Sequence, residues 1–129
     1  MSGLRNGFGL LGCLFGLVPL AWANDAATER GRALLLNHQA SGCVLCHRIP
    51  GLASRAELGP DLAGVASRLD AKALFDRIAD ARRQQPQTLM PPALSEDNLR
   101  HVAPEWQGKT LLAPQQVHDI VSYLMAHAR

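Results

Sequence analysis

The sequence predicts an all-α domain in which three helices are joined by long loops. Helical spacing is clearest in the last segment, which starts at Pro114. Its apolar face is formed by Val117, Ile120, Val121, Leu124 and Ala128. No segment shows sustained alternation of apolar and polar residues, which argues against a sheet. The chain has 129 residues, enough for one domain.

Two further helices and a long loop are predicted. The first helix covers residues 26–38, where an apolar patch follows Thr28-Glu29, and residues 37–42 form a turn. The second helix starts after Asp70, a suitable N-cap, and runs to about Arg83. Pro114 suits the first position of the last helix. Residues 91–113 lack periodicity, and a loop of that length usually has a function.

The N-terminus predicts an exported protein. Residues 1–23 read as a signal peptide, because Arg5 precedes an apolar run and Ala21-Trp22-Ala23 forms a cleavage site. The domain then covers residues 24–129, in the periplasm. The apolar run is too short and too rich in glycine for a membrane span. A lipoprotein box ending at Cys13 is disfavoured, because it would cut the run after a few residues.

The most informative motif is Cys43-Val44-Leu45-Cys46-His47, the attachment signature of haem c. Cys43 and Cys46 are predicted to form thioethers, and His47 to be the proximal iron ligand. A disulfide oxidoreductase would need a strand–helix context around the cysteines, and a zinc site would need a second ligand pair. Neither is present. The sequence therefore predicts one covalently bound haem.

Met90 is the candidate for the second iron ligand. It stands in Thr88-Leu89-Met90-Pro91-Pro92, where the prolines restrict its backbone and stiffen the loop. Met125 lies beside an apolar helix face, so packing explains it better. A haem with two histidine ligands remains the alternative. Histidine–methionine ligation would suit an electron carrier, because methionine raises the reduction potential.

Two other features bear on the site. Pro60, in Gly59-Pro60-Asp61-Leu62, either offers its carbonyl to the second ring nitrogen of His47 or belongs to an ordinary Gly-Pro turn. Residues 103–110 match a relaxed phosphate-loop pattern, but no strand precedes them and Pro114 follows closely. A net charge of +2 gives no reason to expect nucleic acid or an anionic membrane as a partner.

Blocks along most of the predicted domain resemble one family. They are Gly42–His47, Ile49-Pro50, Gly59–Ala66, Arg68, Asp80–Arg83, Pro86, Thr88–Pro92, Val102–Pro104, Gln107–Lys109 and Asp119–Leu124. The sequence is similar to the monohaem cytochrome X subunits of the bacterial Sox thiosulfate-oxidising system. Asn98 stands where this family suggests glycine, Thr110 where it suggests proline, and Ala113-Pro114 where it suggests Thr/Ser-Ala.

The resemblance implies a class I cytochrome c fold with haem ligated by His47 and Met90. It implies a heterodimer with the Sox A subunit, together an L-cysteine S-thiosulfotransferase. That pair joins thiosulfate oxidatively to a cysteine of the YZ carrier complex, and the X subunit passes the electrons to a downstream cytochrome. This chain would then carry electrons and have no catalytic residues of its own.

Two rival functions stay open at this point. One is a free-standing periplasmic electron shuttle to a terminal oxidase or a dehydrogenase. The other is an enzyme or sensor whose haem has an open sixth position. A further hypothesis is that the loop 91–113, with its lone aromatic Trp106, forms part of a partner surface or covers a haem edge.

Overall fold

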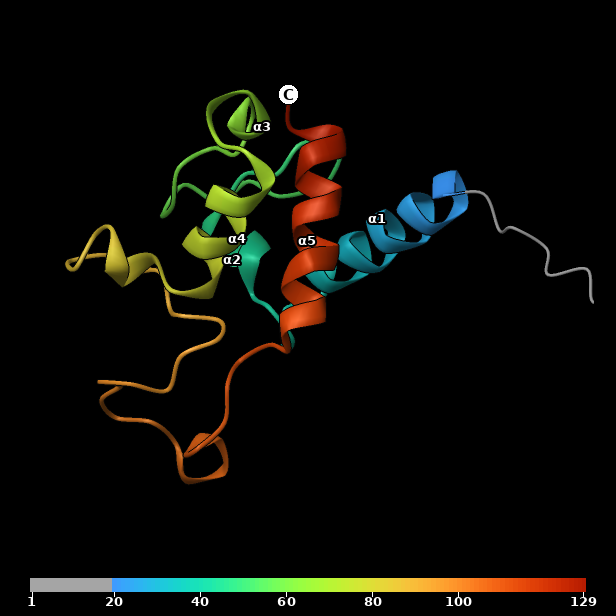
Figure 1. Ribbon diagram of the computed structural model, residues 1–129. Helices are drawn as coiled ribbons and strands as arrows, with labels where there is room; N and C mark the ends of the chain where they lie inside the picture. Colours follow the sequence, from blue (N-terminus) through green and yellow to red (C-terminus); the bar gives the residue numbers. More distant parts are fainter. Residues whose placement is uncertain (1–19) are drawn as a thin grey trace, which may run out of the picture.

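The computed structural model describes residues 20–129, all-α as predicted (Figure 1). The predicted signal peptide lies outside these residues except for its last four, and Cys13 lies outside them as well. The elements in chain order are α1 (Leu20–Leu36), α2 (Cys43–Cys46), α3 (Val65–Arg68), α4 (Ala71–Ala79), η1 (Ala81–Arg83), η2 (Pro104–Trp106) and α5 (Pro114–His127). Within residues 20–129 there is no strand, and no helix is both long and apolar enough to cross a bilayer.

The first and last helices, α1 and α5, cross and form the frame of the fold (Figure 1). Gly31 lies where the two backbones come close together. A Cβ atom at Gly31 would lie 2.0 Å from the carbonyl oxygen of Asp119, so only glycine permits this close approach. Beside the crossing, Arg30 donates two hydrogen bonds of 2.8 Å to the buried carboxylate of Asp119. Gln115 donates a third, of 3.1 Å. The crossing is therefore fixed by close backbone packing and by a charged pair.

The bounds of α1 differ from the prediction at both ends. The helix begins at Leu20, six residues earlier than predicted, and continues through the predicted cleavage point after Ala23. It ends at Leu36, where Asn37 starts the predicted turn. The Asn37 side chain accepts hydrogen bonds from the amides of Gln39 and Ala40, both 3.0 Å. Asparagine thus competes with the helix for backbone donors and ends it.

The second predicted helix is correct at its start and wrong at its end. Asp70 caps α4 by accepting from the amide of Ala73 at 2.7 Å. The helix stops at Ala79 because Asp80 takes an extended backbone (φ −161°, ψ 92°). The Asp80 carboxylate then accepts from the amide of Arg82 and starts η1. The helix was predicted to continue to about Arg83 because Leu74, Ile78 and Ala81 have the spacing of one helix face.

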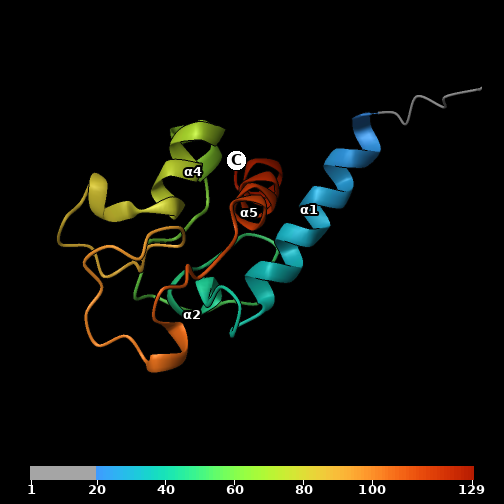
Figure 2. The ribbon, with the colours of Figure 1, turned by 60° about the horizontal axis from the view of Figure 1, so that its bottom comes forward.

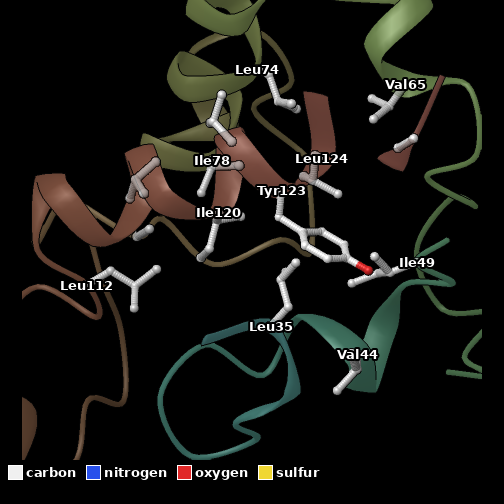
Figure 3. Packing of buried hydrophobic residues seen from close by; sticks show 14 residues of the cluster. Leu35, Val44, Ile49, Val65, Leu74, Ile78, Leu112, Ile120, Tyr123 and Leu124 are labelled. Atoms are coloured by element: carbon white, nitrogen blue, oxygen red, sulfur yellow. The ribbon is translucent and has the colours of Figure 1, made fainter. Parts of the chain in front are cut away.

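The core gathers around α5, whose predicted apolar face is confirmed. Val117, Ile120, Val121, Leu124 and Ala128 are all 5 % exposed or less. Figure 3 shows Tyr123 reaching from α5 toward Ile49, with Leu35 and Val44 nearby. Tyr123 is the only aromatic side chain among the fully buried residues of this core. Aliphatic side chains therefore make up almost all of the packing.

The predicted long loop leaves the body on the side away from α1 (Figure 2). Its base is closed by a 3.0 Å hydrogen bond from the Leu112 amide to the Ala93 carbonyl. Between these residues the chain forms only the short η2. Asn98 has φ 56°, the left-handed region that favours glycine and, among other residues, asparagine. Asparagine at the position where the family suggests glycine is therefore consistent with this backbone.

Candidate haem site

The two cysteines lie on α2, a single helical turn. Gly42 precedes it with φ 64°, which turns the chain out of the preceding loop. Because residues three apart on a helix are neighbours, Cys43 and Cys46 lie on one side of this turn. Both thiols are free and partly buried. Burial raises the pKa of the Cys43 thiol. The structure thus presents a pair of unbridged thiols.

His47 leaves the helix with an extended backbone (φ −112°, ψ 141°). Its Nδ1 lies 2.8 Å from the carbonyl oxygen of Pro60. Because a carbonyl oxygen only accepts, Nδ1 must carry the proton, and Nε2 of the neutral ring keeps a free lone pair. A ligating histidine needs that arrangement.

Gly59 allows the imidazole to lie where it does. A Cβ atom at this position would be 2.5 Å from Cε1 and 2.7 Å from Nδ1 of His47. The ring therefore packs directly on the glycine backbone. Gly59 also donates its amide to the Cys46 carbonyl at 2.7 Å. Every side chain other than hydrogen would push the imidazole away from Pro60.

The chain between His47 and Pro60 is closed by several hydrogen bonds. The Leu62 amide donates to the Arg48 carbonyl at 2.9 Å. The Ser54 hydroxyl lies within hydrogen-bonding distance of the Val44 and His47 carbonyls. The Tyr123 hydroxyl donates to the Pro50 carbonyl at 2.9 Å. This last contact ties the segment to α5, and therefore to the frame of the fold.

Met90 lies on a loop that is fixed differently. Its side chain is partly buried and packs against the core, whereas the neighbouring Leu89 is 84 % exposed. The Met90 amide donates to the Thr88 hydroxyl at 3.1 Å. Pro91 and Pro92 follow directly. Local turn chemistry and the prolines therefore direct the thioether inward and Leu89 outward.

The other histidines and Met125 are placed elsewhere. His38 and His101 are exposed. His118 lies against Phe75, with ring centroids 4.5 Å apart, and His127 stacks on Tyr123 at 4.3 Å. Met125 packs against the core, as predicted. Residues 20–129 contain no cluster of three or more His, Cys, Asp and Glu side chains that could hold a metal ion.

The donor set fits a covalently bound haem. Two free thiols, an imidazole with Nε2 unprotonated and a thioether are the groups that haem c takes. Leucines next to these groups remain exposed: Leu45 (57 %), Leu58 (71 %) and Leu89 (84 %). Apolar surface beside the donors is what a porphyrin would cover, and it would add the aromatic bulk that the core lacks.

Comparison with known proteins identifies the family. A model of the cytochrome c family matches residues 28–128. The chain belongs to the cytochrome c family. Its cofactor is haem c, and its fold is the class I cytochrome c fold. The matched residues include the Cys43–His47 motif and Met90.

Two solved structures share this fold. One is a chain of SoxXA from P. pantotrophus, with a TM-score of 0.68 and 24 % identity over 79 % of this cytochrome and 82 % of that chain. The other is the c-type cytochrome SorU from Sinorhizobium meliloti, with a TM-score of 0.56 and 17 % identity over 81 % of this cytochrome and 93 % of that chain. No curated protein matches the sequence.

Sequence reasoning missed several residues that shape the site. Gly59 was noted only as part of a Gly-Pro pair, although its contact with His47 excludes a side chain. The Tyr123–Pro50 contact joins residues 73 apart in sequence, and no local pattern signals it. Arg82, which reaches the segment after Met90, was noted only within a family block. A Gly-Pro pair shortly after a haem motif is the one signal that would have pointed to Gly59.

Proposed function

We propose that Cys43 and Cys46 bind the haem covalently and that His47 and Met90 are its iron ligands. The observation that carries the proposal is the 2.8 Å contact between His47 Nδ1 and the Pro60 carbonyl. With this contact the imidazole carries its proton on Nδ1, so that Nε2 is free to bind iron, and the orientation of the ring is fixed. Met90 is supported by its inward placement on a stiff loop and by the placement of the four other histidines.

The chain then functions as an electron carrier. The haem supplies a centre that is reversibly oxidised and reduced by one electron. The protein sets the potential through its ligands and through burial, and a methionine ligand raises it. The residues of this chain would hold and orient the group, and bond chemistry would take place on a partner.

We further propose that this cytochrome is the X subunit of a periplasmic Sox XA complex, an L-cysteine S-thiosulfotransferase. The blocks shared with that family are spread over residues 42–124. The fold is similar to that of a chain in a complex named SoxXA. The predicted signal peptide agrees with the periplasm, the compartment where the A subunit and the YZ carrier complex would be met.

The proposed reaction explains why the complex needs an electron carrier. A carrier cysteine thiolate and thiosulfate join through a new sulfur–sulfur bond, giving a cysteine S-thiosulfonate and releasing two electrons. Bond formation would occur on the A subunit. This cytochrome would take the electrons one at a time and pass them to a downstream cytochrome, so the sulfur is oxidised and the acceptor is reduced.

The loop 91–113 is proposed to face the A subunit. Trp106 is 44 % exposed, and with Leu99, Val102 and Lys109 it lines a groove of about 450 Å³. An exposed tryptophan beside apolar and charged groups resembles the centre of many protein interfaces. The same loop lies away from α1 (Figure 2), so docking there would leave the α1–α5 frame undisturbed.

The ligand assignment is tested by carbon monoxide binding to the reduced holoprotein. The wild type should bind it poorly because Met90 fills the sixth position. Met90→Ala should bind it readily, whereas the matched variant Met125→Ala should behave as the wild type. If Met90→Ala still excludes carbon monoxide, a histidine fills the position and the assignment fails. If the wild type itself binds readily, the open-site alternative is correct.

The Sox assignment is tested separately, by isolation from the native periplasm. A stable complex with a second haem protein is expected, and its cytochrome X haem should be reduced when thiosulfate and a YZ carrier are added. A carrier lacking its reactive cysteine is the control and should give no reduction. Isolation as a lone monomer that reduces a terminal oxidase would instead establish the free-standing shuttle, leaving the ligand assignment intact.

A further inference from the structure

The loop that carries Met90, residues 84–92 (the Met90 loop), has no helix or strand of its own. Its position depends on what holds its two ends. Before it, the amides of Gln84 and Gln85 donate to the carbonyl of Ala81, the first residue of η1, two residues after the end of α4. After it, the Ala93 amide donates to the Ile78 carbonyl at 3.2 Å and the Leu94 amide to the Ala79 carbonyl at 3.0 Å. Both ends therefore return to the end of α4.

Arg82 joins the two ends from the side. Its guanidinium donates to both carboxylate oxygens of Asp80, from Nε and Nη2, at 2.8 Å each. The same group reaches across the loop, from Nη1 to the Asp97 carbonyl at 2.7 Å and from Nη2 to the Ser95 hydroxyl at 3.2 Å. Ser95 also accepts from the Asp97 amide at 3.2 Å. We refer to Asp80, Arg82, Ser95 and Asp97 as the Arg82 clamp.

The clamp is well shielded from water on the Asp80 side. The Asp80 side chain is 11 % exposed and that of Arg82 is 24 % exposed. The hydrogen bond from Arg82 lowers the pKa of Asp80, so the carboxylate stays charged at neutral pH. Hydrogen bonds between charged partners are roughly twice as strong as neutral ones. The clamp therefore connects η1 with residues 95–97 firmly, and none of its four residues is one of the proposed haem donors.

We propose that Arg82 is a positioning residue for Met90. It holds residues 93–97 against η1, and through Pro91 and Pro92 it fixes where the Met90 sulfur lies. The inference rests on the Met90 ligation proposed above. An iron–thioether bond is weak, so the fraction of time that the sulfur is in place depends on how firmly the loop ends are held. Arg82 thereby acts on the second iron ligand through the ends of the Met90 loop.

Arginine suits this role through its shape as well as its charge. Its planar fork donates in fixed directions to three residues at once. Lysine would keep the charge but would meet at most part of the set. Arg82→Lys is therefore expected to behave more like Arg82→Met than like the wild type. A purely electrostatic effect of residue 82 would instead make Arg82→Lys equal to the wild type.

The experiment compares full-length holoproteins carrying Arg82→Met, Arg82→Lys or Ser95→Ala with two matched controls. Lys72→Met removes one positive charge from an exposed pair with Asp76 on the same helix, α4. Arg30→Met breaks another two-bond arginine–aspartate pair, at the α1–α5 crossing. Each is measured for the weak red absorption band of a ferric methionine-ligated haem, for the reduction potential, and for carbon monoxide affinity of the ferrous form.

Arg82→Met should weaken the red band, lower the potential and raise carbon monoxide affinity about tenfold to a hundredfold, the scale of a lost charge-assisted hydrogen bond. Ser95→Ala, which removes one side-chain contact of the clamp, should shift all three in the same direction by less. Lys72→Met should change none. Arg30→Met should lower the melting temperature and still leave the band and the potential unchanged.

Three outcomes would overturn the inference. Arg82→Met and Ser95→Ala could both keep the wild-type band, potential and carbon monoxide affinity, which would leave Met90 ligation standing without a role for the clamp. Arg30→Met could change the band as much as Arg82→Met does. Any loss of stability would then weaken Met90 ligation, and the clamp would have no specific role. The wild type could lack the red band, which would remove the ligand assignment and the inference with it.

Discussion

The histidine side of the site, residues 43–62, is held by neutral backbone groups and by close packing, whereas the methionine side, residues 78–97, depends on a partly buried charge pair. His47 lies against Gly59 and bonds to the Pro60 carbonyl. The one ion pair on this side, Arg48–Asp61 at 3.7 Å, is about half exposed at both partners and contributes little. Met90 instead depends on loop ends that Arg82 and Asp80 hold together.

The two sides of the site differ in how far their geometry can be adjusted. Steric packing on a glycine backbone has few alternative arrangements, so the imidazole is either in place or displaced. A charged clamp around a loop responds to pH, to salt and to partners that bind the loop. If His47 and Met90 ligate the iron as proposed, the histidine side secures the haem and the methionine side is where its properties can be tuned.

Gly59→Val should have the largest effect and would break the histidine side. Its Cβ would meet the imidazole at 2.5 Å, so we expect loss of His47 ligation, seen as loss of the low-spin absorption spectrum of the purified protein. Gly108→Ala is the control. Gly108 has φ 69°, unlike Gly59, but the atom nearest to a Cβ there would be 3.9 Å away. It should cost about 1 kcal/mol of stability with an unchanged spectrum. A normal spectrum in Gly59→Val would contradict the steric argument.

As the pH is lowered, the methionine side should lose stability before the histidine side. Arg82 lowers the folded-state pKa of Asp80, chiefly by its hydrogen bond. The stability that this carboxylate contributes is therefore complete above the ordinary aspartate pKa of about 4 and is lost as the pH falls through the lower folded value. Peptide-level hydrogen exchange, corrected for intrinsic rate, should show residues 93–97 losing protection before residues 59–62. The opposite order would contradict the comparison.

The same reasoning applies to the α1–α5 crossing, where Arg30 and Gln115 lower the pKa of the buried Asp119. Its contribution also disappears as the pH falls below about 4. Asp80→Asn provides the control, because it should abolish the pH dependence of exchange at residues 93–97 while leaving that at the crossing.

Tyr123→Phe should have a smaller effect, on the contact that ties the histidine side to α5. The variant leaves the buried ring in place and removes the hydroxyl that donates to the Pro50 carbonyl. We expect a loss of about 1 kcal/mol in the free energy of unfolding, measured with urea. Ser122→Ala on the same helix removes only a local bond to the His118 carbonyl and should cost nothing measurable. Equal costs for the two variants would mean that α5 does not hold the histidine side.

Trp106→Ala should leave the haem unchanged and weaken binding to the A subunit. The spectrum and the melting temperature should stay as in the wild type, because the side chain is 44 % exposed. Affinity for the A subunit, measured by calorimetry, should fall about tenfold or more if the tryptophan is an interface anchor. Leu36→Ala on α1, which removes another partly exposed apolar side chain, should leave the affinity unchanged. Unchanged affinity in Trp106→Ala would move the partner surface elsewhere.

Features that depend on neighbouring residues could be predicted from the amino-acid sequence. The spacing of Cys43, Cys46 and His47 defines the haem motif, the prolines after Met90 mark a stiff loop, and the apolar face of α5 follows from its period. The Asp70 cap is likewise a local interaction. Such features are readable because the interacting atoms lie within a few residues of one another, whatever the rest of the chain does.

Contacts between segments that are distant in the sequence could be identified only in the folded structure. Gly31 is required because α1 and α5 touch there, and Gly59 because the His47 ring returns onto it. The Arg82 clamp exists because the chain after Met90 comes back to the end of α4. Each depends on where two segments meet in space, and residue type alone does not specify that. The haem motif is therefore local chemistry, while the proposed control of its second ligand would be a property of the folded chain.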